Sequence, residues 1–211
     1  MSEARANILA RLRAARRGAV PDRPDWTPPA YGPDRLARFR AMLEAVHGEV
    51  IEVTSATWTE RLRTLLAERG VTTAMAAPDL GLDAAWAGRG PEVVAYDRPV
   101  EAMKDRLVHD IQAGITRARA GIAETGTLVL WPDAAEPRLL SLLPPLHVAL
   151  LRLGTLADNL SALMAEQNWA AGLPTNLLLI SGPSKTADIE QTLAYGVHGP
   201  KELVVLVLTD L

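Results

Sequence analysis

The stretch from Thr175 to Asp210 constrains the fold of this 211-residue chain most strongly. Two short apolar runs lie near its ends, at 176–180 and 203–208. Runs of this length and composition predict strands that are covered on both faces, as in a parallel sheet. Between them, Gly182 and Pro183 predict a turn, and the polar residues that follow predict a helix from Ser184 that ends at Gly196.

The same alternation of strands and helices extends toward the N-terminus. Apolar spacing predicts helices at 34–47, 57–69, 79–86, 101–109 and 155–168, and strands at 49–53, 71–76, 92–96 and 146–153. Residues 111–131 predict a hairpin whose turn is supplied by Thr125 and Gly126, and 139–145 a brief helical turn. The expected class is α/β: a Rossmann-like, mostly parallel sheet with helices on both faces.

Residues 1–33 differ from this pattern and are expected to form an N-terminal arm, with the main domain at 34–211. Residues 2–17 predict a basic helix with an apolar stripe of Ile8, Leu9 and Leu12, and 20–33 form a Pro-rich connector. Two interpretations stay open for the basic helix. It docks on an acidic partner or another subunit, or it is a solvated helix.

Composition excludes several classes of function. Because the chain contains no cysteine, it has no disulfide, no thiolate nucleophile and no cysteine-ligated cluster or zinc site. The four histidines lack metal-ligand spacing, so no metal site and no cofactor in this chain are expected. The net charge of −3 gives no general attraction to nucleic acid. No signal peptide or membrane span is apparent, which predicts a cytoplasmic protein.

The turn at 181–186 is a candidate anion site, because a helix N-terminus presents unpaired backbone N–H groups. Gly182 and Pro183 shape this turn, and Ser184, Lys185 and Thr186 add two hydroxyls and one cation. Asp188 follows on the expected helix, where it would cap the turn or orient Lys185 or His198. The alternative is an ordinary capped turn that carries a solvated lysine.

Four blocks occur in a fixed order: GIAETGT at 121–127, LLPPLH at 142–147, SGPSKTADIE at 181–190 and GVHGP at 196–200. Together they resemble the LUD-domain proteins of the lactate-utilisation protein C type, over residues 34–211. The resemblance implies a fold similar to the NagB/RpiA/CoA-transferase group in a bacterial protein. It also implies a part in oxidising L-lactate to pyruvate, together with iron–sulfur partner proteins. Since this chain lacks cysteine, the clusters are expected in those partners.

The blocks carry the candidate site residues. Glu124 is the candidate nucleophile, by analogy with CoA transferases of similar fold, and Thr125, Gly126 and Thr127 accompany it. The alternative for Glu124 is a turn carboxylate that accepts nearby N–H groups. His198, next to Gly199, is the candidate general base, because imidazole exchanges protons near neutral pH. Lys185 is the candidate cation for a carboxylate, and His147 is expected to be structural or to support the site.

The loops at 124–127, 143–147, 181–186 and 196–200 are expected to converge beyond the carboxyl ends of the strands, where ligands bind in open α/β sheets. Three functions follow as hypotheses. The chain is a non-autonomous subunit of an L-lactate oxidation system, binding a small carboxylate or a partner's loop at 181–200. Alternatively, it is a stand-alone acyl- or CoA-transferase-like enzyme that uses Glu124, or a regulatory or assembly subunit without catalysis.

Overall fold

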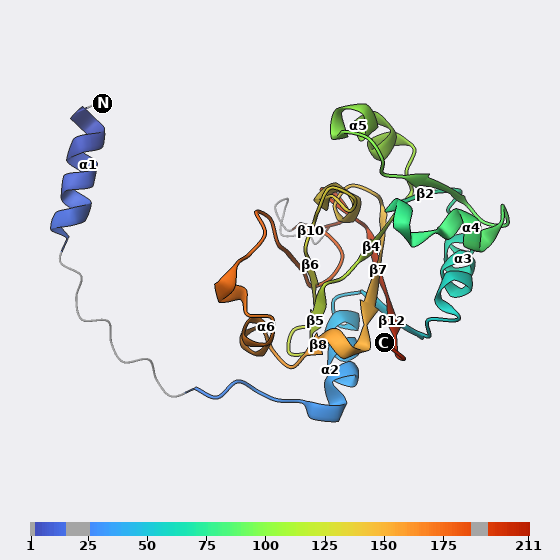
Figure 1. The fold of residues 1–211 in the computed structure, drawn as a ribbon, viewed down its shortest axis with the longest axis horizontal. Coiled ribbons are helices and arrows are strands. Elements are labelled where there is room, and N and C mark those ends of the chain that lie inside the picture. The colour runs from blue at the N-terminus through green and yellow to red at the C-terminus, as the bar shows by residue number, and fades with distance from the viewer. Residues whose placement is uncertain (1–2, 16–25, 187–193) are drawn as a thin grey trace.

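A computed structural model describes residues 3–15, 26–186 and 194–211. Its centre is a six-stranded sheet in the order β1-β12-β7-β4-β2-β3, and every neighbouring pair is parallel (Figure 1). The strands span Glu49–Val53, Glu202–Leu208, Leu146–Arg152, Ala113–Arg117, Thr73–Ala76 and Glu92–Ala95, in that order. The predicted class of an α/β fold around a mostly parallel sheet is therefore confirmed.

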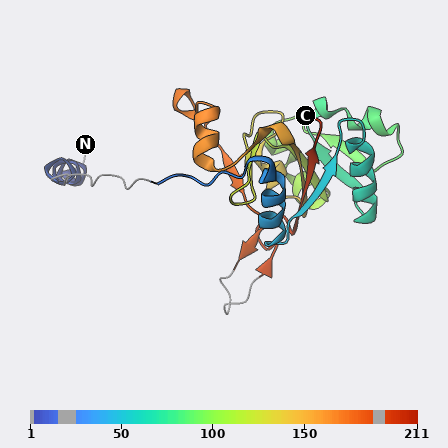
Figure 2. The ribbon, with the colours of Figure 1, turned by 90° about the horizontal axis from the view of Figure 1, so that it is seen from below.

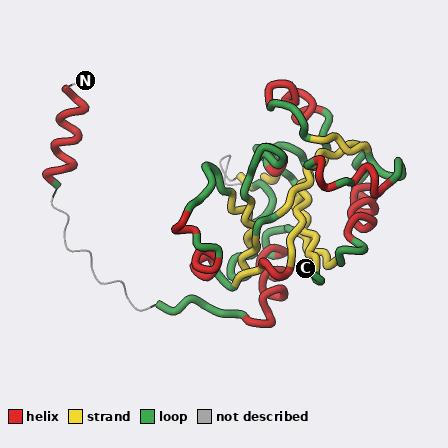
Figure 3. The backbone as a smooth tube through the Cα atoms, viewed as in Figure 1, coloured by secondary structure: helices red, strands yellow, loops and turns green. Residues whose placement is uncertain are grey.

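Helices cover both faces of this sheet, as predicted (Figure 3). On one face lie α3 (Trp58–Glu68) and α4 (Leu82–Trp86). Leu62, Leu65 and Leu66 share one side of α3 and are fully buried against alternate residues of the central strands. On the other face, α2 (Arg35–Glu44) packs through Phe39 and Leu43, and α5 (Val100–His109) packs through Met103 and Leu107.

A second, four-stranded sheet shares the face that α2 covers. Its order is β8-β5-β6-β9, with bounds Leu156–Ala157, Ala120–Ile122, Thr127–Leu130 and Leu178–Ile180. Of the hairpin predicted at 111–131, the part at 120–130 is confirmed as the antiparallel pair β5 and β6, with Gly126 in the left-handed region at φ 63°, whereas 113–117 form β4 of the large sheet. Helix α6 (Leu160–Glu166) packs beside this sheet, and Asn159 caps it by accepting the Ala162 N–H at 2.9 Å. Short 3-10 helices lie at Gly32–Asp34, Pro78–Leu80, Arg138–Ser141 (η3), Leu153–Thr155 and Trp169–Ala171.

Two predictions for the stretch at 175–210 are wrong. The first apolar run is an edge strand of the small sheet, and Leu179 of β9 is 49% exposed, so this strand is not covered on both faces. The residues near both ends of the predicted helix form strands instead. β10 (Lys185–Thr186) pairs antiparallel with β11 (Ala194–Tyr195) as a hairpin. Figure 2 shows this hairpin projecting from the body. Residues 187–193 lie outside the described residues.

The N-terminal helix α1 (Glu3–Ala14) exists close to its predicted bounds, and none of its residues is buried. The connector reaches the body at 31–35, where the Asp158 carboxylate accepts the Tyr31 backbone N–H at 2.8 Å and binds Arg35 through two guanidinium nitrogens. The division at residue 33 into arm and domain stays a prediction. Within the described residues, no helix combines the length and apolarity that crossing a bilayer requires.

Candidate functional site

Three of the four predicted loops converge, but at the amino edge of the large sheet. The loops at 143–147 and 196–200 precede β7 and β12, and a loop that precedes a parallel strand lies at its amino end. The 181–186 segment joins them, because the Ser184 N–H donates to Pro200 O and the Gly196 N–H donates to Ser184 O, both at 2.9 Å. The expected convergence at the carboxyl ends is therefore wrong for these loops.

These segments enclose a pocket of about 210 Å³, here called the amino-edge pocket. Its floor is formed by strand residues of the large sheet, and its walls come from η3, the end of β9 and the loop before β12. The lining residues are Ser141, Leu142, His147, Ile180, Gly182, Pro183, Ser184, His198, Gly199, Pro200 and Leu203. Most of the wall is apolar, and the polar groups are two serines and two histidines.

His147 forms the floor of the amino-edge pocket. It lies in β7 between Gly114 of β4 and Leu203 of β12, and it is 1% exposed. Its Nε2 is 2.8 Å from the Thr116 hydroxyl. Burial lowers the pKa of His147 from 6.5 to about 4, because a charged imidazole loses its hydration there. The ring is therefore neutral at pH 7, which fits the predicted supporting role better than that of a cation.

Gly114 makes room for the wall of the pocket. A Cβ at this position would lie 2.0 Å from the carbonyl oxygen of Leu140 in η3. Only glycine permits this approach of backbone to sheet. The close packing fixes η3, which carries Ser141, over the amino end of β4.

Ser184 and His198 line the pocket from two neighbouring segments that are joined by hydrogen bonds. A Cβ on Gly199 would lie 2.9 Å from the Ser184 Cβ, so the two backbone segments are close together. The His198 side chain is solvent-exposed. A small molecule in the pocket would meet the Ser184 hydroxyl and the His198 imidazole, both able to donate or accept hydrogen bonds.

Lys185 and Thr186 are not among the residues that line this pocket. Both lie on β10, where successive side chains point to opposite faces, so Lys185 points away from the side on which Ser184 lies. The predicted helix N-terminus at 184–186 is wrong, because Lys185 and Thr186 form a paired strand, and anion binding by these residues stays a prediction. Asp188 lies outside the described residues.

Glu124 lies in the β5–β6 turn, apart from the residues that line the amino-edge pocket. Its N–H donates to Asp158 O at 2.9 Å, and its carbonyl accepts from Arg38 at 3.2 Å. Hydroxyl contacts of 2.6 Å link Thr125 to Thr127 and Thr127 to Ser181. Gly126 packs against the backbone of Met42 and Leu43 in α2. The nucleophilic role of Glu124 stays a hypothesis.

Residues 36–208 match the LUD domain family. The chain belongs to this family. The relatives of this LUD domain include the uncharacterized protein NMB1437 of Neisseria meningitidis serogroup B, 38% identical over 97% of this chain and 93% of that protein. Lactate utilization protein C of Macrococcus caseolyticus is 28% identical over 90% of this chain and 87% of that protein.

A solved structure also resembles this LUD domain. It is a DUF162 family protein from Deinococcus radiodurans, with a TM-score of 0.64 and 21% identity, covering 86% of this chain and all of that one. This likeness supports the fold alone. The expected kinship with the NagB/RpiA/CoA-transferase group stays a prediction.

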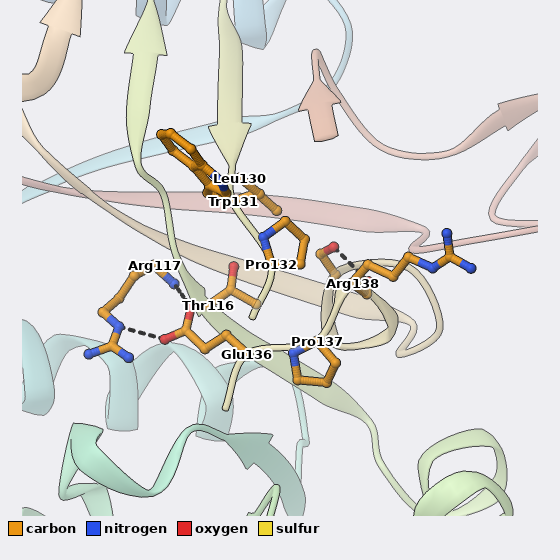
Figure 4. A pocket seen from close by; sticks show the side chains of 9 residues that line it. Thr116, Arg117, Leu130, Trp131, Pro132, Glu136, Pro137 and Arg138 are labelled. Atoms are coloured by element: carbon orange, nitrogen blue, oxygen red, sulfur yellow. Dashed lines mark hydrogen bonds and ion pairs between the residues drawn. The ribbon is translucent and has the colours of Figure 1, made fainter. Parts of the chain in front are cut away.

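The LUD domain has a second hollow that the sequence did not predict. It lies at the carboxyl edge of the large sheet, where β4 ends at Arg117 and β7 ends at Arg152. Arg117, Arg119, Arg152, Trp131 and Glu136 line its larger part, of about 520 Å³. We call it the carboxyl-edge cleft. Figure 4 shows its inner end, with Arg117 and Glu136 facing each other near Trp131.

The electrostatics at the inner end are largely balanced. Glu136 accepts the Arg117 backbone N–H at 2.9 Å and its Nε at 2.5 Å, and Asp79 accepts Arg117 Nη1 at 2.7 Å. Burial raises the pKa of Glu136, and the contacts with Arg117 oppose this rise. Among the residues that the structure describes, no group of acidic and histidine side chains is arranged to hold a metal ion.

Proposed function

We propose that this protein is a subunit of an L-lactate utilisation system that oxidises L-lactate to pyruvate together with iron–sulfur partner proteins. The printed names of several relatives support a role in lactate utilisation. Removing two electrons from lactate requires an acceptor, and this chain has no cysteine to hold an iron–sulfur cluster. The acceptor is therefore assigned to the partners.

The observation that carries the site assignment is the meeting of Ser184, His198 and His147 around one pocket of about 210 Å³. In this proposal a small 2-hydroxy acid occupies the pocket. Its carboxylate accepts hydrogen bonds at the mouth, where Ser184 lies, and its hydroxyl faces His198. His198 takes the hydroxyl proton, the C2 hydrogen leaves as a proton to solvent, and the two electrons of the C2–H bond pass to the acceptor in the partners. Neutral His147, held by Thr116, positions the substrate from below.

The N-terminal helix is the proposed contact with the partners. Arg11 and Arg13 lie in its last turn, and Ile8 and Leu12 are 59% and 66% exposed. An exposed apolar stripe beside basic side chains suits an acidic partner surface. Removing residues 1–20 is expected to abolish co-purification of the partners.

The test is complementation of a deletion strain whose growth on L-lactate depends on this protein, combined with a tagged pull-down. His198→Asn is expected to lower lactate turnover about 10²- to 10⁴-fold, the range that a general base contributes, and so to prevent growth on L-lactate while retaining its partners. His109→Asn, a surface change on α5, is the control. The pull-down is expected to contain cysteine-rich partners and to absorb in the visible range.

Two results would overturn the proposal. If the purified chain alone turned over L-lactate with an artificial electron acceptor, no partner would be needed. If the His198→Asn strain grew like wild type while removal of residues 1–20 stopped growth, the protein would be an assembly subunit without catalysis.

A further inference from the structure

The carboxyl-edge cleft joins two lobes that share Arg117, Ala118 and Arg152. Ser141 lines both the inner end of this cleft and the amino-edge pocket, but no residue that lines the two lobes also lines that pocket. We propose that this cleft is a second ligand site, which binds an organic anion with an apolar body larger than lactate. The proposal does not depend on the function assigned to the amino-edge pocket.

The charges in the cleft leave two arginines available to a ligand. Arg117 is committed to Asp79 and Glu136. Arg119 stacks on the Trp131 ring at 4.8 Å, and its Nε donates to the neutral Gln167 at 3.3 Å. Arg152 is solvent-exposed at the end of β7 and forms no ion pair with any other residue in the described ranges. Guanidinium groups that form no ion pair within the protein can bind the carboxylate or phosphate of a ligand through paired N–H donors.

Acidic groups in the lining do not cancel this charge. Glu136 is held by Arg117, and the Asp133 carboxylate accepts the backbone N–H groups of Ala135 and Glu136, both at 2.8 Å. The nearby acids are all committed, Asp79 and Glu136 to Arg117 and Asp133 to backbone N–H groups, so Arg119 and Arg152 keep positive charge that no acid among the described residues pairs with. The site therefore favours an anion over a neutral ligand.

The smaller lobe, of about 330 Å³, supplies the apolar wall. Trp58, Leu150 and Leu208 line it beside Arg152. Trp131 and Pro132 line the other lobe. An anionic group on Arg152 would thus have apolar side chains on both sides. Lactate has too few carbons to reach these walls, whereas a planar or branched organic anion would fill them.

Tryptophan fluorescence of the full chain tests the proposal, because Trp58 and Trp131 line the two lobes. The probes are benzoate and phenyl phosphate, which carry the same ring on a carboxylate or a phosphate. Inorganic phosphate and phenol are the half-probes. At least one whole probe is expected to cause saturable quenching, with a dissociation constant at least about tenfold below that of either half-probe. The stronger whole probe identifies the anion class.

Arg152→Gln is expected to raise the dissociation constant of the whole probe at least about tenfold, since it removes a charged hydrogen-bond partner. Its side chain is exposed, so the fold should persist, and circular dichroism checks this. Arg61→Gln, on the surface of α3, is the matched control and should bind like wild type. Arg119→Gln supplies a second variant. The proposal is overturned if neither whole probe quenches saturably, or if both cleft variants bind like wild type.

Discussion

His147 shows how one buried residue couples the amino-edge pocket to pH. Because burial lowers its pKa from 6.5 to about 4, the unfolded chain takes up a proton between these values that the folded chain excludes. Stability is therefore full above pH 6.5 and falls as the pH drops toward 4. At a pH below both values, where the whole effect is present, this group lowers the free energy of unfolding by about 3 kcal/mol.

The first prediction is that His147→Gln flattens this pH dependence. Urea unfolding at pH 7.0, 5.5 and 4.5 measures it. Glutamine retains a donor for Thr116 but does not titrate. The exposed His109→Gln variant should keep the wild-type slope. An unchanged slope in His147→Gln would show that other groups cause the acid sensitivity.

Gly114 supports a second prediction at the residue scale. Gly114→Ala places a methyl group 2.0 Å from the Leu140 carbonyl oxygen, so η3 must move. The expected cost is about 1 to 3 kcal/mol in the free energy of unfolding. Gly172→Ala, which meets no atom within 4 Å, is the control and should lose much less. Equal stability of the two variants would mean that η3 relaxes freely.

Single residues were predicted with mixed success. His198 and His147 were singled out because an imidazole beside glycines or on a buried strand is visible in sequence, and both line the amino-edge pocket. Arg117, Arg119 and Arg152 were missed, because Lys and Arg together make up 22 residues and nothing local distinguishes these three. The parallel pairing of Arg117 with Leu150 places the ends of β4 and β7, and so Arg117 and Arg152, side by side.

At the scale of elements, the connector is fixed by one carboxylate. Asp158 joins Tyr31 and Arg35 to the segment after β8, and these contacts lower the pKa of Asp158, chiefly through Arg35. Asp158→Ala is expected to destabilise the protein by about 1 to 2 kcal/mol, since charged hydrogen bonds are lost at a partly exposed site.

The same variant should be cleaved faster by trypsin near Arg35, as followed by mass spectrometry. Asp79→Ala, which removes another carboxylate–arginine contact, is the control and should not alter cleavage there. Equal cleavage of Asp158→Ala and wild type would show that other contacts hold the connector.

The elements themselves were predicted best where apolar spacing is long and regular. Helix α3 and strand β1 lie close to their predicted bounds for this reason. The hairpin of β10 and β11 was missed, because Ser184 and Thr186 resemble helix caps, while the hydrogen bonds that decide the outcome join Ser184 to Pro200 and Gly196. A short apolar run such as 178–180 indicates a strand but does not reveal whether it lies at an edge.

At the scale of the whole molecule, the sheet order predicts how stability is distributed. Strands β7 and β12 are central, and nearly all their residues are buried. In hydrogen exchange followed by mass spectrometry, peptides from these strands should be protected longest. Peptides covering 178–186 should exchange early, because β9 is an edge strand and, in the part of the chain that the structure describes, β10 pairs only with β11. Similar protection in both regions would contradict this prediction.

The fold class could be predicted from sequence, because few folds accommodate alternating strands and helices. The edge of the sheet at which the amino-edge pocket lies could not be predicted. Its position depends on which loops precede parallel strands, and the strand order β1-β12-β7 is not visible in a local pattern.

That order has a consequence for synthesis on the ribosome. Among the strands of the described residues, β1 pairs with β12 alone, through contacts such as Glu49 with Val204. At ordinary elongation rates the roughly 150 residues between these strands take about 8 to 30 seconds to translate. Throughout this interval Val50, Ile51 and Val53 of β1 lack the strand beside which they pack in the described fold, which makes the nascent chain a client for chaperones that bind extended apolar segments.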